Sequence, residues 1–512
     1  MFLALALVWS ACAKLEEQPL GILTPVAFFN KPADGQTAIM GAYALFESYE
    51  DYGNDIQMSI GAQDDQNKIA YAGDHMNIDL MLPIVPTNEK VNTQWFRIYG
   101  EIGAANSAIA GIQTIPTANI TSDTRNALIA EATVLRAFNY FRLVRMYGAV
   151  PYIDKAITDP ASVATTTKMP TADIYTHIIA DLEASKDLLP NSWDAGGPYR
   201  SRISRGTAYT VLADVYLTRQ NWTLAAQNAE FVIDHKAEFG YDLLPDFAKV
   251  FDFWSGNDNR EYIWSVDFSH TDHGYPVGRD QFCMLAGLPS WFGWAYGGWG
   301  TLYAPAQALR DFQKGDYRRK VSFWEDAPDQ GGVIHHYDEV TKPFPQNSPA
   351  VAKTYFSFIG HPSVNGLYGQ DNAFETDANW PIYRYAEVLL IAAEAENNLS
   401  HTSVAIGYAN QVRSRARNYN GVVGSSLIPA DFIGLSQAAF QDSIIMERKR
   451  ELAFEYKRWF DIVRLNLTLS TVFGPTGSDP LPNSGSLTQA FRFWPIPQSE
   501  VDKNPNLALP VD

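Results

Sequence analysis

The 512-residue sequence has little cysteine and no long apolar run. Its two cysteines are Cys12 and Cys283. If Cys12 is modified, as argued below, Cys283 has no partner within the chain, and we expect a fold without disulfides. No segment approaches 18 consecutive apolar residues, so we expect no membrane-spanning helix in the body of the chain.

Positive charge is also scarce. Lys and Arg number 39 against 57 Asp and Glu, which gives a formal charge of −18. Such a surface repels phosphate backbones, so we expect no nucleic-acid partner. Polyanionic polymers are disfavoured for the same reason, which leaves neutral small molecules, neutral polymers and other proteins.

Several sequence motifs of catalysis are absent. The chain has no phosphate-binding Gly-x4-Gly-Lys-Ser/Thr loop, no dinucleotide-binding Gly-x-Gly-x-x-Gly after a strand, no Gly-x-Ser-x-Gly elbow and no His-Glu-x-x-His. Clustered histidines, such as His335 and His336, lack a third ligand. We therefore expect a protein that is not an enzyme and that binds no resident cofactor.

The N-terminus is typical of a bacterial lipoprotein signal. The apolar run Phe2–Val8 is too short to span a bilayer and ends in small residues directly before Cys12. This pattern predicts a signal over residues 1–12 that ends at a lipidated Cys12, so that lipid alone attaches the chain to a membrane. The alternative is a cysteine in a buried N-terminal strand, which the polar residues 13–19 disfavour.

Apolar residues recur at helical spacing in blocks that Pro and Gly separate. We predict helices over residues 90–112, 123–147, 171–189, 205–219, 222–236, 384–398, 402–418 and 436–465. Asp123 is the expected N-cap of the second. The fold class is therefore mainly α.

Two pairs of these helices share one pattern of small residues. Ala213 and Ala225 are separated by the same interval as Ala393 and Ala405, and both pairs place small side chains where antiparallel helices approach each other. The spacing resembles that of tetratricopeptide-type helix pairs. Residues 13–512 are therefore read as one domain, a helical scaffold with a loop-rich insertion at about 240–380, in which 262–268 alternates like a strand.

Charged residues are dense between Glu447 and Arg464. On one continuous helix, Glu455 with Arg458 and Lys457 with Asp461 have the spacing of ion pairs. We interpret this segment as structural rather than catalytic.

The candidate binding residues lie in a segment in which aromatic side chains alternate with glycine: Trp291, Phe292, Trp294, Tyr296 and Trp299. Aromatic faces stack on the C–H faces of pyranose rings, and glycine lets a loop present them. The alternative is that these rings fill the core beneath the loop. Binding of a sugar by at least one of them is the hypothesis that we favour.

Asp64 and Asp65 form a second candidate. They lie in an oxygen-rich stretch that would suit a ligand or a cation, although the spacing of an EF-hand is missing. Calcium is therefore kept open, and no other metal is expected.

Four stretches together resemble the SusD/RagB family of outer-membrane nutrient-binding lipoproteins. They are Glu131–Pro151, Tyr383–Ala395, Glu447–Arg464 and Pro495–Leu507. The resemblance runs from Cys12 to Leu507 and is carried by residues of the fold rather than of the ligand site.

This resemblance implies four tetratricopeptide-like helix pairs with a variable, loop-rich, aromatic half. It also implies a lipid anchor in the outer leaflet of the outer membrane, exposed at the cell surface, and a SusC-type TonB-dependent transporter as partner. The implied function is capture of an oligosaccharide without catalysis. Trp291, Trp294 and Tyr296 fit the family's binding arc, whereas Trp299 fits a recurring framework stretch.

Two other functions stay open at this point. A RagB-like protein would bind peptides, and an all-helical glycoside hydrolase would need two converging carboxylates, whose separation no sequence can give.

Overall fold

The computed structural model describes residues 28–70, 74–79, 84–193, 200–252, 259–268, 285–286, 299–328, 333–338, 348–353, 379–467, 472–474, 477, 479 and 489–511. Helices dominate these ranges, as the periodicity predicts. None of the helices within them is both long and apolar enough to cross a bilayer.

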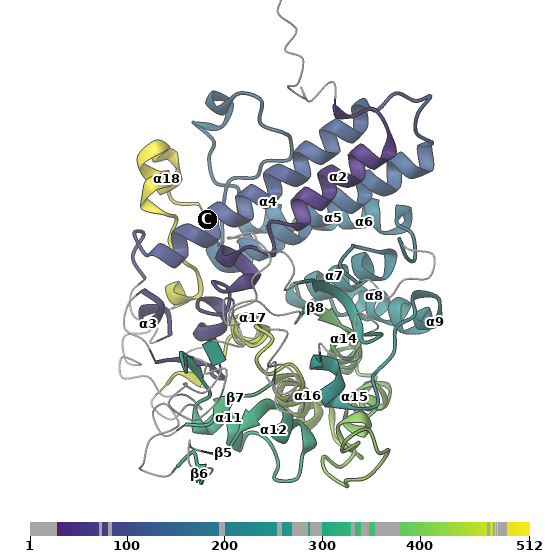
Figure 1. Cartoon of the computed structure of the whole chain (residues 1–512), viewed down its shortest axis with the longest axis vertical. Coiled ribbons are helices and arrows are strands. Elements are labelled where there is room, and N and C mark those ends of the chain that lie inside the picture. The colour runs from purple at the N-terminus through teal and green to yellow at the C-terminus, as the bar shows by residue number, and fades with distance from the viewer. Residues whose placement is uncertain are drawn as a thin grey trace, which may run out of the picture.

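The N-terminal half is built on long helices that pack side by side (Figure 1). They are α2 (Pro32–Tyr43), α4 (Glu89–Thr114), α5 (Ser122–Tyr147) and α6 (Thr171–Ser185), with the short α3 (Asp74–Asp79) beside them. The N-cap of α5 is Thr121, whose hydroxyl accepts a hydrogen bond from the Thr124 amide, and not Asp123 as predicted. The sequence prediction did not include α2, which packs on α4 and α5 and buries Ile39.

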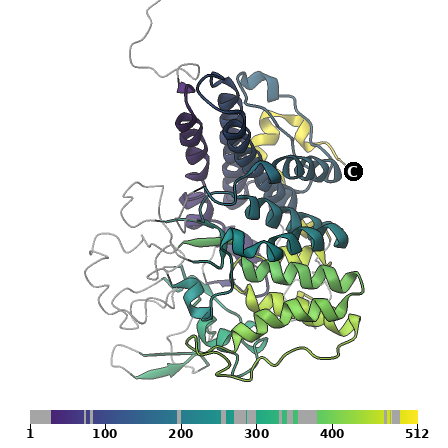
Figure 2. The same cartoon turned by 90° about the vertical axis from the view of Figure 1, so that its right-hand side faces the viewer.

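The second half of the scaffold consists of helix pairs. The pairs are α7 (Arg205–Thr218) with α8 (Trp222–Asp234) and α14 (Tyr385–Asn398) with α15 (Thr402–Ala416). The small residues of the predicted pattern are fully buried, which confirms the close approach: Ala213, Ala225, Ala393 and Ala405. Because α8 also packs on α14, the stack continues across the insertion (Figure 2).

The predicted helix over 436–465 is wrong as a single helix. The chain forms α16 (Gln437–Glu451) and α17 (Arg458–Arg464). Between them, Phe454 and Tyr456 have φ values of 62° and 57°, in the left-handed region that a continuous helix cannot contain. Both side chains are buried, so packing of these two rings stabilises the turn against the helical propensity of the segment.

The insertion contains short elements, and the predicted strand at 262–268 is confirmed. β2 (Tyr262–Val266) pairs antiparallel with β8 (Trp380–Arg384). A four-stranded sheet has the order β1 (Lys68–Ile69), β3 (Leu302–Tyr303), β7 (Ala350–Val351) and β4 (Phe323–Trp324). β5 (Asp326–Pro328) pairs with β6 (Ile334–His336), and the remaining helices are α9 (Lys236–Phe239), α11 (Ala306–Arg310), α12 (Tyr317–Ser322) and α18 (Gln498–Lys503).

Candidate ligand-binding site

Only one residue of the predicted aromatic site lies among the described residues. Trp291, Phe292, Trp294 and Tyr296 fall outside them, and their binding role stays a prediction. Trp299 is described, and 37% of it is exposed to solvent. No other tryptophan in the described part of the chain is exposed to this degree.

Trp299 lies just before β3, a strand of the four-stranded sheet. Two residues later, the buried Thr301 accepts a hydrogen bond from the Ala70 amide at 2.8 Å through its carbonyl oxygen, and β3 begins at Leu302. The sheet thus fixes the backbone directly after Trp299, while 37% of this residue stays exposed. An accessible indole with a fixed base is a suitable face for stacking on a sugar ring.

Asp64 and Asp65 are buried, and Asp65 is an ion-pair partner within the fold. The Asp65 carboxylate accepts hydrogen bonds from Lys449 Nζ at 2.7 Å and Arg458 Nε at 2.8 Å. Asp64 Oδ1 accepts from the amides of Gln66 and Asn67. The contacts of Asp65 join the N-terminal segment to α16 and α17 and give this carboxylate a structural role. A ligand contact of the pair stays a prediction.

The two neighbouring carboxyls have opposite acidities. Burial raises the pKa of Asp64 to about 7, and the charge of Asp65 adds to this effect. Burial also acts to raise the pKa of Asp65, but the charges of Arg458 and Lys449 outweigh it and hold that pKa well below its usual range. No cluster of three or more His, Cys, Asp or Glu side chains suited to a metal occurs within the described ranges, so the calcium prediction gains no donor set there.

A buried network of ion pairs surrounds the end of α16. Arg384 Nη1 contacts Glu261 at 2.5 Å and Glu451 at 3.1 Å, and Arg415 pairs with the same two carboxylates. Charges in this network hold the pKa of Glu451 well below its usual range, Arg415 most strongly, against the opposing effect of burial. Since each of these carboxylates is engaged by guanidinium groups, the network holds α14, α15 and α16 together rather than serving a substrate.

The ion pairs predicted within one helix are wrong, because the turn after α16 directs the side chains elsewhere. Glu455 pairs with Arg384 and Lys353, and Lys457 pairs with Glu387 at 3.0 Å. The carboxylate of Asp461 binds arginines of both helices, Arg448 at 3.2 Å and Arg464 at 2.8 Å. The structural interpretation of the segment agrees with these contacts.

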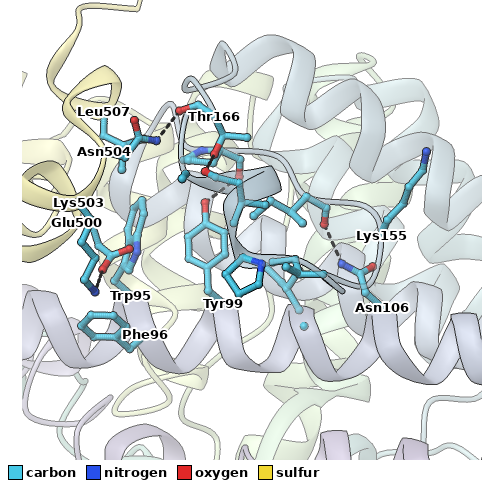
Figure 3. A pocket seen from close by; sticks show the side chains of 18 residues that line it. Trp95, Phe96, Tyr99, Asn106, Lys155, Thr166, Glu500, Lys503, Asn504 and Leu507 are labelled. Atoms are coloured by element: carbon cyan, nitrogen blue, oxygen red, sulfur yellow. Dashed lines mark hydrogen bonds and ion pairs between the residues drawn. The ribbon is translucent and has the colours of Figure 1, made fainter. Parts of the chain in front are cut away.

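A pocket of about 360 Å³ lies between α4, the segment 151–166 and α18 (Figure 3). Trp95, Phe96, Lys503 and Glu500 gather at one end of it, while Asn106 and Lys155 lie at the other. Phe96 is 48% exposed, and its ring lies 5.3 Å from the ammonium of Lys503. The walls of this pocket come from three segments that are distant in the chain, so no local sequence pattern predicts it.

Three polar side chains in the pocket wall already have partners. The Tyr99 hydroxyl donates to the Pro151 carbonyl oxygen at 2.7 Å, and the Asn504 amide donates to the Thr166 carbonyl oxygen at 2.7 Å. Asn106 is likewise held, by Ile153 and Arg136. Since sugar hydroxyls need free donors and acceptors, the pocket suits an apolar group better than a sugar.

Comparison with known proteins gives two family matches. Residues 260–508 match the SusD family, and residues 31–217 match a family described as starch-binding and associating with the outer membrane. SusD-like protein P2 of Formosa agariphila is 35% identical over 513 residues, covering 99% of this chain and 97% of that protein.

Solved structures share the fold. A SusD homolog from Bacteroides thetaiotaomicron superposes with a TM-score of 0.79 at 22% identity and covers 94% of this chain and 97% of its own. A laminarin-binding SusD-like protein gives a TM-score of 0.75 at 20% identity, with coverage of 93% and 98%.

Proposed function

The chain belongs to the SusD family, and from this premise we propose that it captures a neutral oligosaccharide at the cell surface and delivers it to a SusC-type TonB-dependent transporter. The observation that carries the glycan proposal is the exposed indole of Trp299, at the end of the predicted aromatic segment. Binding by stacking requires no catalytic group, so the protein acts without catalysis.

Two further points support a neutral glycan. A solved relative of the same fold is described as laminarin-binding, and another as a surface glycan-binding protein. The charge of −18 disfavours anionic polymers. Stacking on a few rings predicts a dissociation constant between micromolar and millimolar, about −8 to −4 kcal/mol.

The proposed binding face is Trp299 together with Trp291, Phe292, Trp294 and Tyr296. The experiment compares the chain that begins at Ala13 with its Trp291→Ala/Trp294→Ala/Tyr296→Ala variant on affinity gels that contain neutral polysaccharides. Retardation of the parent and free migration of the folded variant is the expected result. Equal retardation of both would remove these three rings from the site.

The same panel tests the other functions. No retardation by any glycan, together with binding to a peptide library, would favour a peptide-binding protein. Release of reducing sugar would instead establish a glycoside hydrolase. We expect neither result, because the proposed site is a stacking surface and no pair of catalytic carboxylates is part of the proposal.

The proposed location is the outer leaflet of the outer membrane, with lipid on Cys12. This anchor is proposed from the small residues before Cys12, which lie outside the described residues, and from the family described as associating with the outer membrane. Labelled palmitate should enter the parent and not a Cys12→Ser variant, and protease added to whole cells should digest the parent. Protection of the protein in intact cells would contradict surface exposure.

A further inference from the structure

The pocket between α4, the segment 151–166 and α18 takes no part in the proposed glycan site. None of its lining residues belongs to the insertion that carries Trp299. Its volume of about 360 Å³ lies in the range of pockets that hold small molecules. The pocket is therefore a separate candidate site, and its walls define the ligand that fits.

The walls of the pocket are fastened to one another. Hydrogen bonds from the side chains of Tyr99 and Asn106 hold the segment 151–166 against α4. Asn506 Nδ2 donates to the Thr165 carbonyl oxygen at 2.9 Å, which ties the chain after α18 to the same segment. A ligand that enters this pocket therefore has little ordering cost to overcome.

The pocket follows one face of α4. Trp95, Tyr99, Gly103 and Asn106 line it and recur at helical spacing, so they extend along the helix for about 16 Å. Figure 3 shows Trp95 and Phe96 at one end and Asn106 at the other. An elongated ligand fills such a pocket better than a single ring does.

Apolar groups dominate the accessible part of the lining. Phe96 is 48% exposed and Ile157 is 47% exposed, and both line the pocket. Gly103 adds open space, because a Cβ atom there would meet no atom within 4 Å. A ligand with an apolar body would remove Phe96 and Ile157 from water, which favours binding.

One cationic side chain of the lining is available to an anion. Glu500 and Lys503 pair with each other at 2.8 Å, whereas Lys155 has neither an ion pair nor a hydrogen bond with the described residues. Asp154 and Asp159 are close to Lys155 in the chain, but neither of them lines the pocket. Figure 3 places Lys155 at the end of the pocket opposite the ion pair.

We propose that this pocket binds a linear aliphatic carboxylate, with its charged end at Lys155 and its alkyl chain along α4 toward Phe96. A sugar fits poorly, because its hydroxyls would find Tyr99, Asn106 and Asn504 already hydrogen-bonded. An esterified acyl chain of a membrane lipid lacks the negative charge that Lys155 attracts. The ligand is therefore a free acid.

The test uses the chain from Ala13 to Asp512, which contains every described residue, and measures binding by isothermal titration calorimetry. The probes are hexanoate, octanoate and decanoate, below the concentrations at which they form micelles. Affinity should rise about threefold for each added CH₂ group, because each one buries apolar surface. No binding, or equal binding of hexanoate and decanoate, would overturn the proposal.

A variant that fills the pocket locates the site. Gly103→Leu places an alkyl side chain in the open space beside α4 and should weaken decanoate binding at least tenfold. Gly100→Leu is the matched control, because a Cβ atom at Gly100 also meets no atom within 4 Å and Gly100 does not line the pocket. The control should bind within twofold of the parent, and circular dichroism shows whether both variants are folded. Full binding by Gly103→Leu would exclude this pocket.

A charge variant tests the carboxylate independently of pocket filling. Lys155→Met keeps the apolar stem and should weaken octanoate binding about two- to fivefold, the range of an exposed ion pair. Binding of the neutral octanol should be unchanged in this variant. Lys314→Met, which removes an exposed lysine outside the pocket, is the control and should change neither probe. Equal loss of octanoate and octanol binding in Lys155→Met would overturn the role of the charge.

Phosphatidylcholine liposomes test the other source of an acyl chain. The chain that begins at Ala13 should not sediment with them, because their acyl chains are esterified. Sedimentation of the parent that Gly103→Leu abolishes would assign the pocket to a membrane lipid and overturn the proposal. None of these results depends on the glycan proposal, since the two sites share no residue.

Discussion

Arg384 and Glu455 form a two-pronged ion pair in the interior, with Nε 2.7 Å from Oε2 and Nη2 2.8 Å from Oε1. The pair joins the start of α14 to the turn that follows α16. Planar guanidinium and carboxylate groups suit this geometry, and both side chains are buried. The turn and the helix stack therefore depend on each other.

Glu455→Gln should lower the free energy of unfolding by about 3–5 kcal/mol, because it leaves Arg384 and Lys353 buried with a weaker partner. The matched control is Glu500→Gln, which breaks an exposed pair with Lys503 and should cost about 1 kcal/mol or less. Urea unfolding followed by tryptophan fluorescence measures both. A smaller loss in Glu455→Gln than in the control would contradict a stabilising role for the buried pair.

Asp64 and Asp65 should respond to substitution in opposite directions. The pKa of Asp64 rises from 3.8 to about 7 on folding, so the folded state binds more protons than the unfolded state between these values. The raised pKa of Asp64 stabilises the folded state as long as this carboxyl is protonated. This stabilisation is complete below about pH 4 and is lost as the pH rises through 7. Asp64→Asn should therefore stabilise the protein at pH 8, by up to about 4 kcal/mol.

Asp65→Asn is the control for this effect, since it removes the charge that Lys449 and Arg458 share. It should destabilise the protein at pH 8 by about 3–5 kcal/mol. Unfolding free energies at pH 5 and pH 8 measure both variants. The advantage of Asp64→Asn should shrink at pH 5, and an advantage that is independent of pH would argue against titration of Asp64.

Trp299→Ala should weaken binding of a neutral oligosaccharide about two- to tenfold, the loss expected for one stacked ring at about 0.5–1.5 kcal/mol. Phe96→Ala is the matched control, because Phe96 is an exposed ring outside the proposed binding face, in a pocket where Tyr99, Asn106 and Asn504 already have hydrogen-bond partners. Isothermal titration calorimetry compares the two. Unchanged affinity in Trp299→Ala would assign this residue to the framework of the fold instead.

Substitution by alanine should change the free energy of unfolding in opposite directions at two glycines of α4. A Cβ atom at Gly103 would meet no atom within 4 Å, whereas one at Gly111 would lie 2.0 Å from the ring of Phe29. Gly103→Ala should raise the free energy of unfolding by about 0.5–1 kcal/mol through helix propensity. Gly111→Ala should lower it by about 1–3 kcal/mol through overpacking. Urea midpoints measure both, and equal shifts would show that the ring of Phe29 yields.

The sequence predicted most of the scaffold because helix formation is read from neighbouring residues. The periodicity located α4 to within two residues at each end, and the alanine spacing identified the antiparallel pairs. The break between α16 and α17 escaped prediction, because it depends on the burial of Phe454 and Tyr456 against distant parts of the chain.

Contacts between distant residues account for the other errors. Asp65 lies 384 residues before Lys449 in the chain, so no local pattern joins them, and the sequence alone predicts that Asp65 lies beside a ligand or a cation. The pocket beside Phe96 has the same origin, since α18 completes a wall that α4 begins. The aromatic segment, in contrast, was predicted from neighbouring residues alone. Of its aromatic residues, only Trp299 lies in the described part of the chain.

The pairing of β2 with β8 has a consequence for how such a protein can change over time. Val266 lies opposite Trp380 in register, and Glu261 binds Arg384 at the other end of the strand pair, so residues 267–379 lie between two paired strands. The same stretch is tied to the rest of the chain at two further points, because Thr301 binds Ala70 and Lys353 binds Glu455. Because the entropy of closing a loop grows only with the logarithm of its length, changes of length between these tied residues cost little free energy. The stretch can therefore vary in length between such points while the helical scaffold stays the same.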